Sequence, residues 1–145
     1  MALIDPILNL RTVLYTALSG NVTLSGDAIE VYDRVPNIQT TDYIHFDDFR
    51  IVNVDNHQHF IYEVEAEIEV VTFFQNVEGG KKRAEQITNI LLPLVTSKTG
   101  VLSLGAGWNL VLSKYLRSNY IDEELEFNYV VRKFIVIQFV IQQTT

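Results

Sequence analysis

The chain has 145 residues, 48% of them hydrophobic, and a formal net charge of -7. This length suits one domain over residues 1–145, and so apolar a composition excludes a disordered chain. The acidic charge argues against a nucleic-acid-binding protein, which needs a basic surface, and the absence of cysteine excludes disulfides, thiolate zinc sites and thiol catalysis.

The N-terminal segment predicts a helix. It begins MALIDPILNL, with an acid and no early Lys or Arg, so we expect no signal peptide. No apolar run in the chain approaches the ~20 residues of a membrane span. Asp5 suits the cap of the helix, Pro6 its first position and Ser19-Gly20 its end. Apolar residues recur at helical spacing between these signals, at Ile7, Leu10, Leu14, Ala17 and Leu18.

Three strands are predicted next. A polar loop, NVTLSGDA, leads into a short strand over Ile29–Val35 that Pro36 ends. After a loop, Tyr43–Val54 forms the second strand and Asp55–Gln58 a turn. Because these strands follow one another without a helix between them, we expect antiparallel pairing.

The third strand carries the clearest pattern of the chain. Phe60–Phe74 reads FIYEVEAEIEVVTFF, and this period of two predicts a strand with one buried face. Neighbouring glutamates on its polar face lie about 7 Å apart and repel each other, so this face is wet or a partner supplies positive charge. We expect it to line the lumen of a ring or to meet open solvent. It consists of Glu63, Glu65, Glu67 and Glu69.

A second helix is predicted over Lys81–Val95, after Gly79-Gly80, with Pro93 in its last turn. Three cations at its start oppose the helix dipole, which suggests an external anionic partner such as an acidic patch on a neighbouring copy. A phosphate site is disfavoured, because the spacing and the Ser or Thr of a phosphate-binding loop are missing. An exposed, solvated helix start remains the alternative. The cations are Lys81, Lys82 and Arg83.

The C-terminal part predicts a loop, SKTGVLSLGAG, with room for a short strand, and then two strands. Trp108–Arg117 alternates as a strand, and Asn119–Glu124 reads as a polar loop or bulge, with Asp122, Glu123, Glu124 and Glu126 solvated. The last strand, Phe127–Gln142, is apolar on both faces, so either the monomer or another subunit covers its second face. The residues assigned to an oligomer interface on this face are Phe134, Val136 and Val140.

These elements predict an α+β fold: a single domain with a mainly antiparallel sheet and two helices packed on one face.

Residues that could carry chemistry form no recognisable site. His57 and His59 share a strand face and His45 lies near two aspartates, but zinc sites need three or four supported ligands. The glutamate row lacks the asymmetry that separates the pKa values of a catalytic pair. We expect no metal, no cofactor and no catalysis.

Several segments together resemble the tail-completion, or tail terminator, family of tailed bacteriophages, also called head–tail joining proteins. A helix ending YTALSG precedes VYDRVP at Val31–Pro36, and the strand segment DYIHF follows; Asp42 stands where the family often has proline. The long strand IYEVEAEIEVVTFF followed by KKRAEQITNILLPLV matches the family layout, as do the last two strands. The resemblance covers nearly the whole chain.

The resemblance implies a non-enzymatic virion protein, assembled in the host cytoplasm and located at the head–tail junction. Such proteins form a ring, commonly a hexamer, that caps the tail tube and docks on the head connector, while DNA passes through without tight binding. Two alternatives stay open: another neck or tail ring protein that adapts the portal, and a small enzyme or ligand-binding module using His45, His57 or the glutamates.

Overall fold

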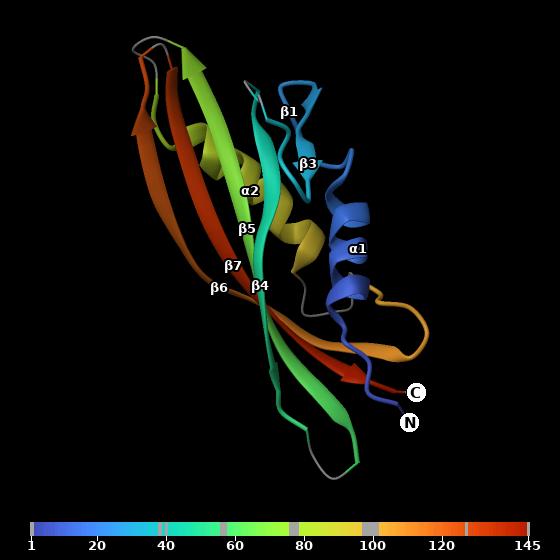
Figure 1. The fold of residues 1–145 in the computed structure, drawn as a ribbon. Helices are drawn as coiled ribbons and strands as arrows, with labels where there is room; N and C mark the ends of the chain where they lie inside the picture. The colour runs from blue at the N-terminus through green and yellow to red at the C-terminus, as the bar shows by residue number, and fades with distance from the viewer. Residues whose placement is uncertain are drawn as a thin grey trace.

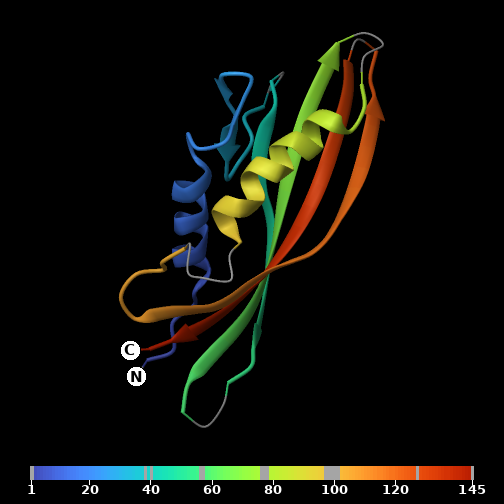
Figure 2. The same cartoon turned by 180° about the vertical axis from the view of Figure 1, so that it is seen from behind.

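The computed structural model describes residues 2–37, 39, 41–55, 58–75, 79–96, 102–126 and 128–144. Its two helices lie on the same side of one long, twisted sheet, as Figures 1 and 2 show. No helix in these ranges is long and apolar enough to span a membrane. The helices are α1 (Ile7–Leu18) and α2 (Lys82–Val95), and the strands are β1 (Thr23–Leu24), β2 (Asp27–Ala28), β3 (Glu30–Tyr32), β4 (Tyr43–Asn53), β5 (Phe60–Gln75), β6 (Trp108–Glu124) and β7 (Asn128–Gln143).

The main sheet has five strands in the order β3-β4-β5-β7-β6. The β4–β5, β5–β7 and β7–β6 pairs are antiparallel. The β3–β4 pair is parallel, which corrects the expectation that all these neighbours pair antiparallel. Because β3 and β4 run in the same direction, they do not form a hairpin. The predicted α+β class, with two helices on one face of a mainly antiparallel sheet, is confirmed.

Helix α1 begins one residue later than the sequence predicts, with Pro6 at the cap position and Ile7 as the first helical residue. The backbone N–H of Ile7 donates to Asp5 Oδ1 at 2.8 Å, so Asp5 satisfies one of the free donors at the helix start. Pro6 stands just before the first helical residue, and its fixed φ suits that entry. In α2, Pro93 lies inside the helix, which nevertheless continues to Val95.

The core lies between the helices and the sheet. Leu10 and Leu14 of α1, Ile87 and Leu91 of α2, and Phe139 of β7 are fully buried in one cluster. Each such side chain contributes roughly 1.5–3 kcal/mol when it leaves water. The alternation of β5 has the predicted effect, since its apolar positions join the core, namely Tyr62, Val64, Ala66, Ile68 and Val70.

Two segments differ from the sequence expectations. The loop before β3 contains a small antiparallel hairpin, β1–β2, which turns at Ser25 and Gly26, both with positive φ. The range Asn119–Glu124 is not a loop: β6 runs without interruption to Glu124 and stays paired with β7. Polar side chains are tolerated there because β6 is an edge strand, where they stay partly in water.

Candidate assembly surfaces

The sheet face opposite the helices, which we call the open face, carries the glutamate row. The register places Glu63, Glu65, Glu67 and Glu69 of β5 beside Val140, Gln138, Val136 and Phe134 of β7. Both predicted surfaces, the acidic row and the even positions of β7, are therefore parts of one surface. Figures 1 and 2 show both helices on the other side of the sheet.

Cations from neighbouring strands meet two of the glutamates. Arg132 of β7 donates to Glu69 at 3.2 Å and to Glu123 at 3.1 Å, while His45 lies 3.8 Å from Glu69. Glu69 is only 7% exposed, and its burial raises its pKa although Arg132 and His45 act in the opposite direction. The positive charge that the row requires thus comes partly from the same chain.

Farther along the row, Arg117 of β6 lies 3.7 Å from Glu65. Among the described residues, Glu67 makes no ion pair with a cation, although Arg50 and Arg117 line the same narrow hollow. Burial, a hydrogen bond with Asp47 and the nearby charges of Asp47 and Asp48 raise its pKa, while Arg50 lowers it. The environment is therefore uneven along the row, which is half-buried at Glu63, Glu65 and Glu67 and buried at Glu69.

The β7 residues of this face are less exposed than an uncovered strand suggests. Val136 is 5% exposed, and a narrow hollow beside it is lined by Glu67, Arg117 and Arg50. The stems of long charged side chains commonly cover apolar neighbours in this way. Phe134 and Val140 are half-buried. Their assignment to a subunit interface stays a prediction.

At one end of the open face, side chains of the same chain bury one another. Tyr43, Val71 and Val130 form a second buried cluster, against which Tyr32 and Phe73 pack. The rings of Tyr43 and Phe73 are 5.9 Å apart. Val130 at one end of β7 is therefore buried within the monomer itself. No described element covers the rest of the open face.

The cations at the start of α2 find anions in their own chain. Lys81 Nζ lies 3.3 Å from Asp122, and Arg83 lies 2.7 Å from Asp42. Lys82 is exposed and makes no ion pair within the described ranges. The anionic partner inferred from the helix dipole is therefore present inside the monomer for two of the three, and a subunit contact of the cluster stays a prediction.

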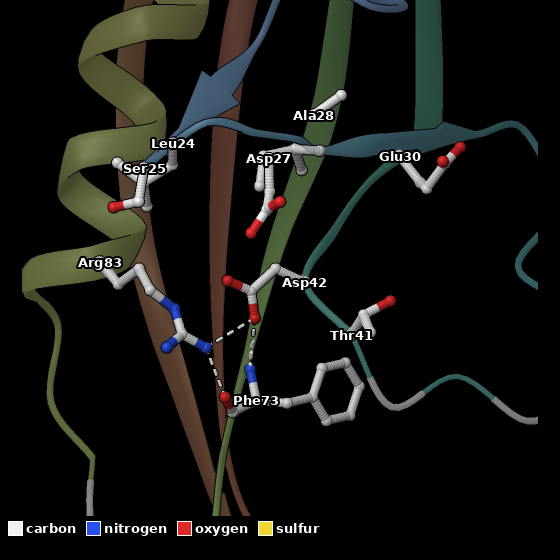
Figure 3. A pocket seen from close by; sticks show the side chains of 10 residues that line it. Leu24, Ser25, Asp27, Ala28, Glu30, Thr41, Asp42, Phe73 and Arg83 are labelled. Carbon is white, nitrogen blue, oxygen red and sulfur yellow. Dashed lines mark hydrogen bonds and ion pairs between the residues drawn. The ribbon is translucent and has the colours of Figure 1, made fainter.

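Arg83 lies beside an open pocket of about 540 Å³ between the β1–β2 hairpin, the start of β4 and α2. Figure 3 shows its guanidinium aimed at Asp42 and at the carbonyl of Phe73, to both of which it donates. Asp42 also accepts the backbone N–H of Phe73 at 3.0 Å. Arg83 Nε is buried without a hydrogen-bond partner. Asp42 therefore joins β4, β5 and α2 at one point.

The other charged residues near β6 are also engaged. Asp122 accepts from Tyr129 at 2.8 Å, and this bond and Lys81 lower its pKa. Tyr120 donates to Glu85 at 3.0 Å, and burial followed by this bond raises its pKa to about 12. The solvated loop expected at Asp122 and Glu123 is thus replaced by strand residues with partners, while Glu124 and Glu126 are exposed.

The histidines are not brought together. His45 lies on the open face beside Glu69, His59 lies just before β5, and His57 falls outside the described residues. Within the described ranges, no group of three or more His, Cys, Asp or Glu residues is placed to hold a metal ion. The expectation that the protein binds no metal stays a prediction.

Arg132, Arg117 and Asp42 make ion pairs that the sequence pattern does not predict. Arg132 has the same parity as Phe134, which places it on the same strand face, so its position on the open face could have been found. Its contact with Glu69 depends on the β5–β7 register, which the sequence pattern does not define. Asp42 carries no local signal, because its partners Phe73 and Arg83 come from distant parts of the chain.

We expect Glu67→Gln to stabilise the protein at pH 7 by about 0.2–1 kcal/mol, because it removes a partly buried charge and its repulsion from Asp47 and Asp48. The raised pKa of Glu67 means that the folded state takes up a proton before the unfolded state does. The penalty of its charge is therefore absent well below the ordinary pKa and is complete above the raised value. Thermal unfolding at pH 7 and pH 4 tests this, with Glu63→Gln as the matched control. An equal gain in stability at both pH values would show that the charge of Glu67 is not what destabilises the protein.

The sequence matches no protein-family model and no curated protein sequence. Among solved structures, the fold is similar to a chain from the virion of a native gene transfer agent (GTA) particle. The two superpose with a TM-score of 0.62 over 94% of this chain and 91% of that chain, at 18% identity. The α+β arrangement is thus shared over almost the full length of both.

Proposed function

We propose that this chain is a non-enzymatic virion protein that forms a ring, most simply a hexamer, at the head–tail junction of a phage-like particle. The ring caps the tail tube and joins it to the head connector. Its partners are further copies of itself, the tube protein and the head-completion protein, and DNA passes through its lumen without tight binding. Residues 1–145 act as one tail-completion-like domain.

The observation that carries this proposal is the fold shared with a virion chain over 94% of this chain. Because 18% identity transfers a fold and not a role, the resemblance to tail-completion proteins supplies the finer assignment. The segments that carry this resemblance lie in the following elements. VYDRVP begins in β3, DYIHF leads from Asp42 into β4, and the glutamate strand β5 precedes α2.

The open face supports a passage for DNA. It presents Glu63, Glu65 and Glu67 in one half-buried row, and Asp47 and Asp48 lie in the bulge of β4 beside this row. Carboxylates repel phosphates, so a lumen lined by this face would let DNA slide without sticking. No nucleophile and base pair contributes a competing explanation among the contacts of the described residues.

Electron microscopy of particles that lack this protein tests the proposal. A tube cap predicts heads without tails together with tubes of uncontrolled length. A portal adaptor, which is the second candidate, predicts free heads together with tubes of normal length. Complete particles would contradict both.

A further inference from the structure

The main sheet has two edges, β6 on one side and β3 with the rest of β4 on the other, and in the described ranges no further strand pairs with either edge. Strand β6 forms one edge over 17 residues. At the other edge, β3 pairs only with Tyr43–His45, so the remainder of β4 has no strand beside it in the described ranges. Unpaired N–H and C=O groups in a long edge strand are a template for pairing with another chain.

The strand directions permit these two edges to meet in a ring. Successive antiparallel pairing from β4 through β5 and β7 to β6 makes β4 and β6 run in opposite directions. For strands that run along a ring axis, rotation about that axis preserves strand direction and keeps the same sheet face toward the axis. Strand β6 of one copy placed beside β4 of the next would therefore pair antiparallel, and every open face would look the same way.

The apolar residues of the two edges lie level with each other. The register links Val52, Glu63, Val140 and Leu112 in one row across the sheet. Val52 is 58% exposed and Leu112 is 41% exposed. Each end of this row thus leaves a large apolar side chain in water, and a lateral neighbour would cover both.

The charges also match. The row of Arg117 runs through Val136 and Glu67 to the bulge of β4, where Asp47 and Asp48 lie. Arg117 retains 59% exposure of its side chain and Asp48 retains 65%, so both are available to a neighbour. A lateral continuation of the sheet brings a cation of one copy to carboxylates of the next.

Two features define which segments fit. Bulges at Val111 and Leu116 bound the regular stretch Leu112–Tyr115 of β6, and the bulge of β4 leaves Phe49–Asn53 regular beyond it. Arg50 lies level with Lys114, and the like charge is moderated because Asp48 lies 3.6 Å from Arg50.

We propose that Leu112–Tyr115 of one copy pairs antiparallel with Phe49–Asn53 of a second copy, so that the sheet continues from subunit to subunit. This inference rests on the proposed ring and names the surfaces that close it. The occupant of each edge is a second copy of this chain, because the two edges complement each other in direction, apolar rows and charge.

A disulfide between introduced cysteines tests the pairing, since the natural chain has none. The variant Val52→Cys with Leu112→Cys places one thiol on each edge. Within one chain, β4 and β6 are three strand spacings apart, about 14 Å, whereas a disulfide needs Cα atoms within about 7 Å. The bond can therefore form only between copies.

The matched control is Val52→Cys with Ile121→Cys. Ile121 is 48% exposed on the same strand but lies level with Tyr43, roughly 30 Å along β6 from Leu112. A second test pair, Arg50→Cys with Lys114→Cys, probes the adjacent row and serves if the first variant does not fold. Each protein is treated with a mild disulfide-forming oxidant, alone and with tube protein.

On non-reducing gels, the proposal predicts a ladder of cross-linked chains for the test pairs, ending in one closed ring of chains. It predicts mostly uncross-linked chains for the control. Rings of normal mass without cross-linking in either test pair would overturn the edge pairing and leave the ring itself intact. Equal cross-linking in test and control would also overturn it, because chance collisions then explain the bonds. A protein that stays monomeric even with tube protein would overturn both the pairing and the proposed ring.

Discussion

Particles carrying Glu63→Lys with Glu67→Lys should assemble normally and deliver DNA roughly tenfold less well or worse, since each added cation offers a contact to phosphate. Both side chains lie on the open face. The lysine at position 67 meets Asp47 and Asp48 in place of the present repulsion, so the fold is expected to be retained. Delivery of DNA per assembled particle, counted by electron microscopy, is the measurement.

The control for this change is Glu124→Lys with Glu126→Lys, which alters the charge equally at exposed positions at and beyond the end of β6. Normal delivery by both variants would show that the open face does not line the DNA passage and is ordinary solvated surface. If only the open-face variant fails to assemble, this face contacts another subunit instead.

Arg83→Ala should lower the free energy of unfolding by roughly 2–3 kcal/mol. It leaves the largely buried carboxylate of Asp42 without its cation and the carbonyl of Phe73 without that donor. The guanidinium also lies 4.3 Å from the centre of the Phe74 ring, a contact that would be lost. Denaturant unfolding of the purified protein measures the change.

Lys82→Ala is the neighbouring control, and an exposed lysine without an ion pair in the described ranges should change stability by less than about 0.5 kcal/mol. Equal stability of the two variants would mean that Arg83 does not anchor α2 to the sheet. If the Arg83→Ala monomer is as stable as the Lys82→Ala monomer but does not assemble, Arg83 contacts a neighbouring subunit, as the sequence predicts.

Local patterns predicted most of the elements because they depend on period and turn residues. The alternation of Phe60–Phe74 identified both β5 and the face that it buries, and Asp5 located the start of α1. Asn119–Glu124 was misread because polar residues in an edge strand resemble a loop. The parallel β3–β4 pair could not be derived, since pairing direction depends on the path of the chain through space.

The sequence predicts the residues of each candidate surface, but it does not predict that the two surfaces lie side by side. The sequence placed the glutamates on one face of β5 and Phe134, Val136 and Val140 on one face of β7. Only the pairing of these strands shows that the two sets adjoin. Ion pairs such as Arg83 with Asp42 join residues far apart in the chain, so composition and spacing carried no sign of them.

The length distribution of tail tubes in particles that lack this protein tests the proposed ring most directly. A cap stops tube growth and supplies the docking face for the head. The account therefore predicts tubes of widely varying length, none attached to a filled head, and rescue by the unaltered protein. Tubes of uniform normal length that are joined to heads would contradict it.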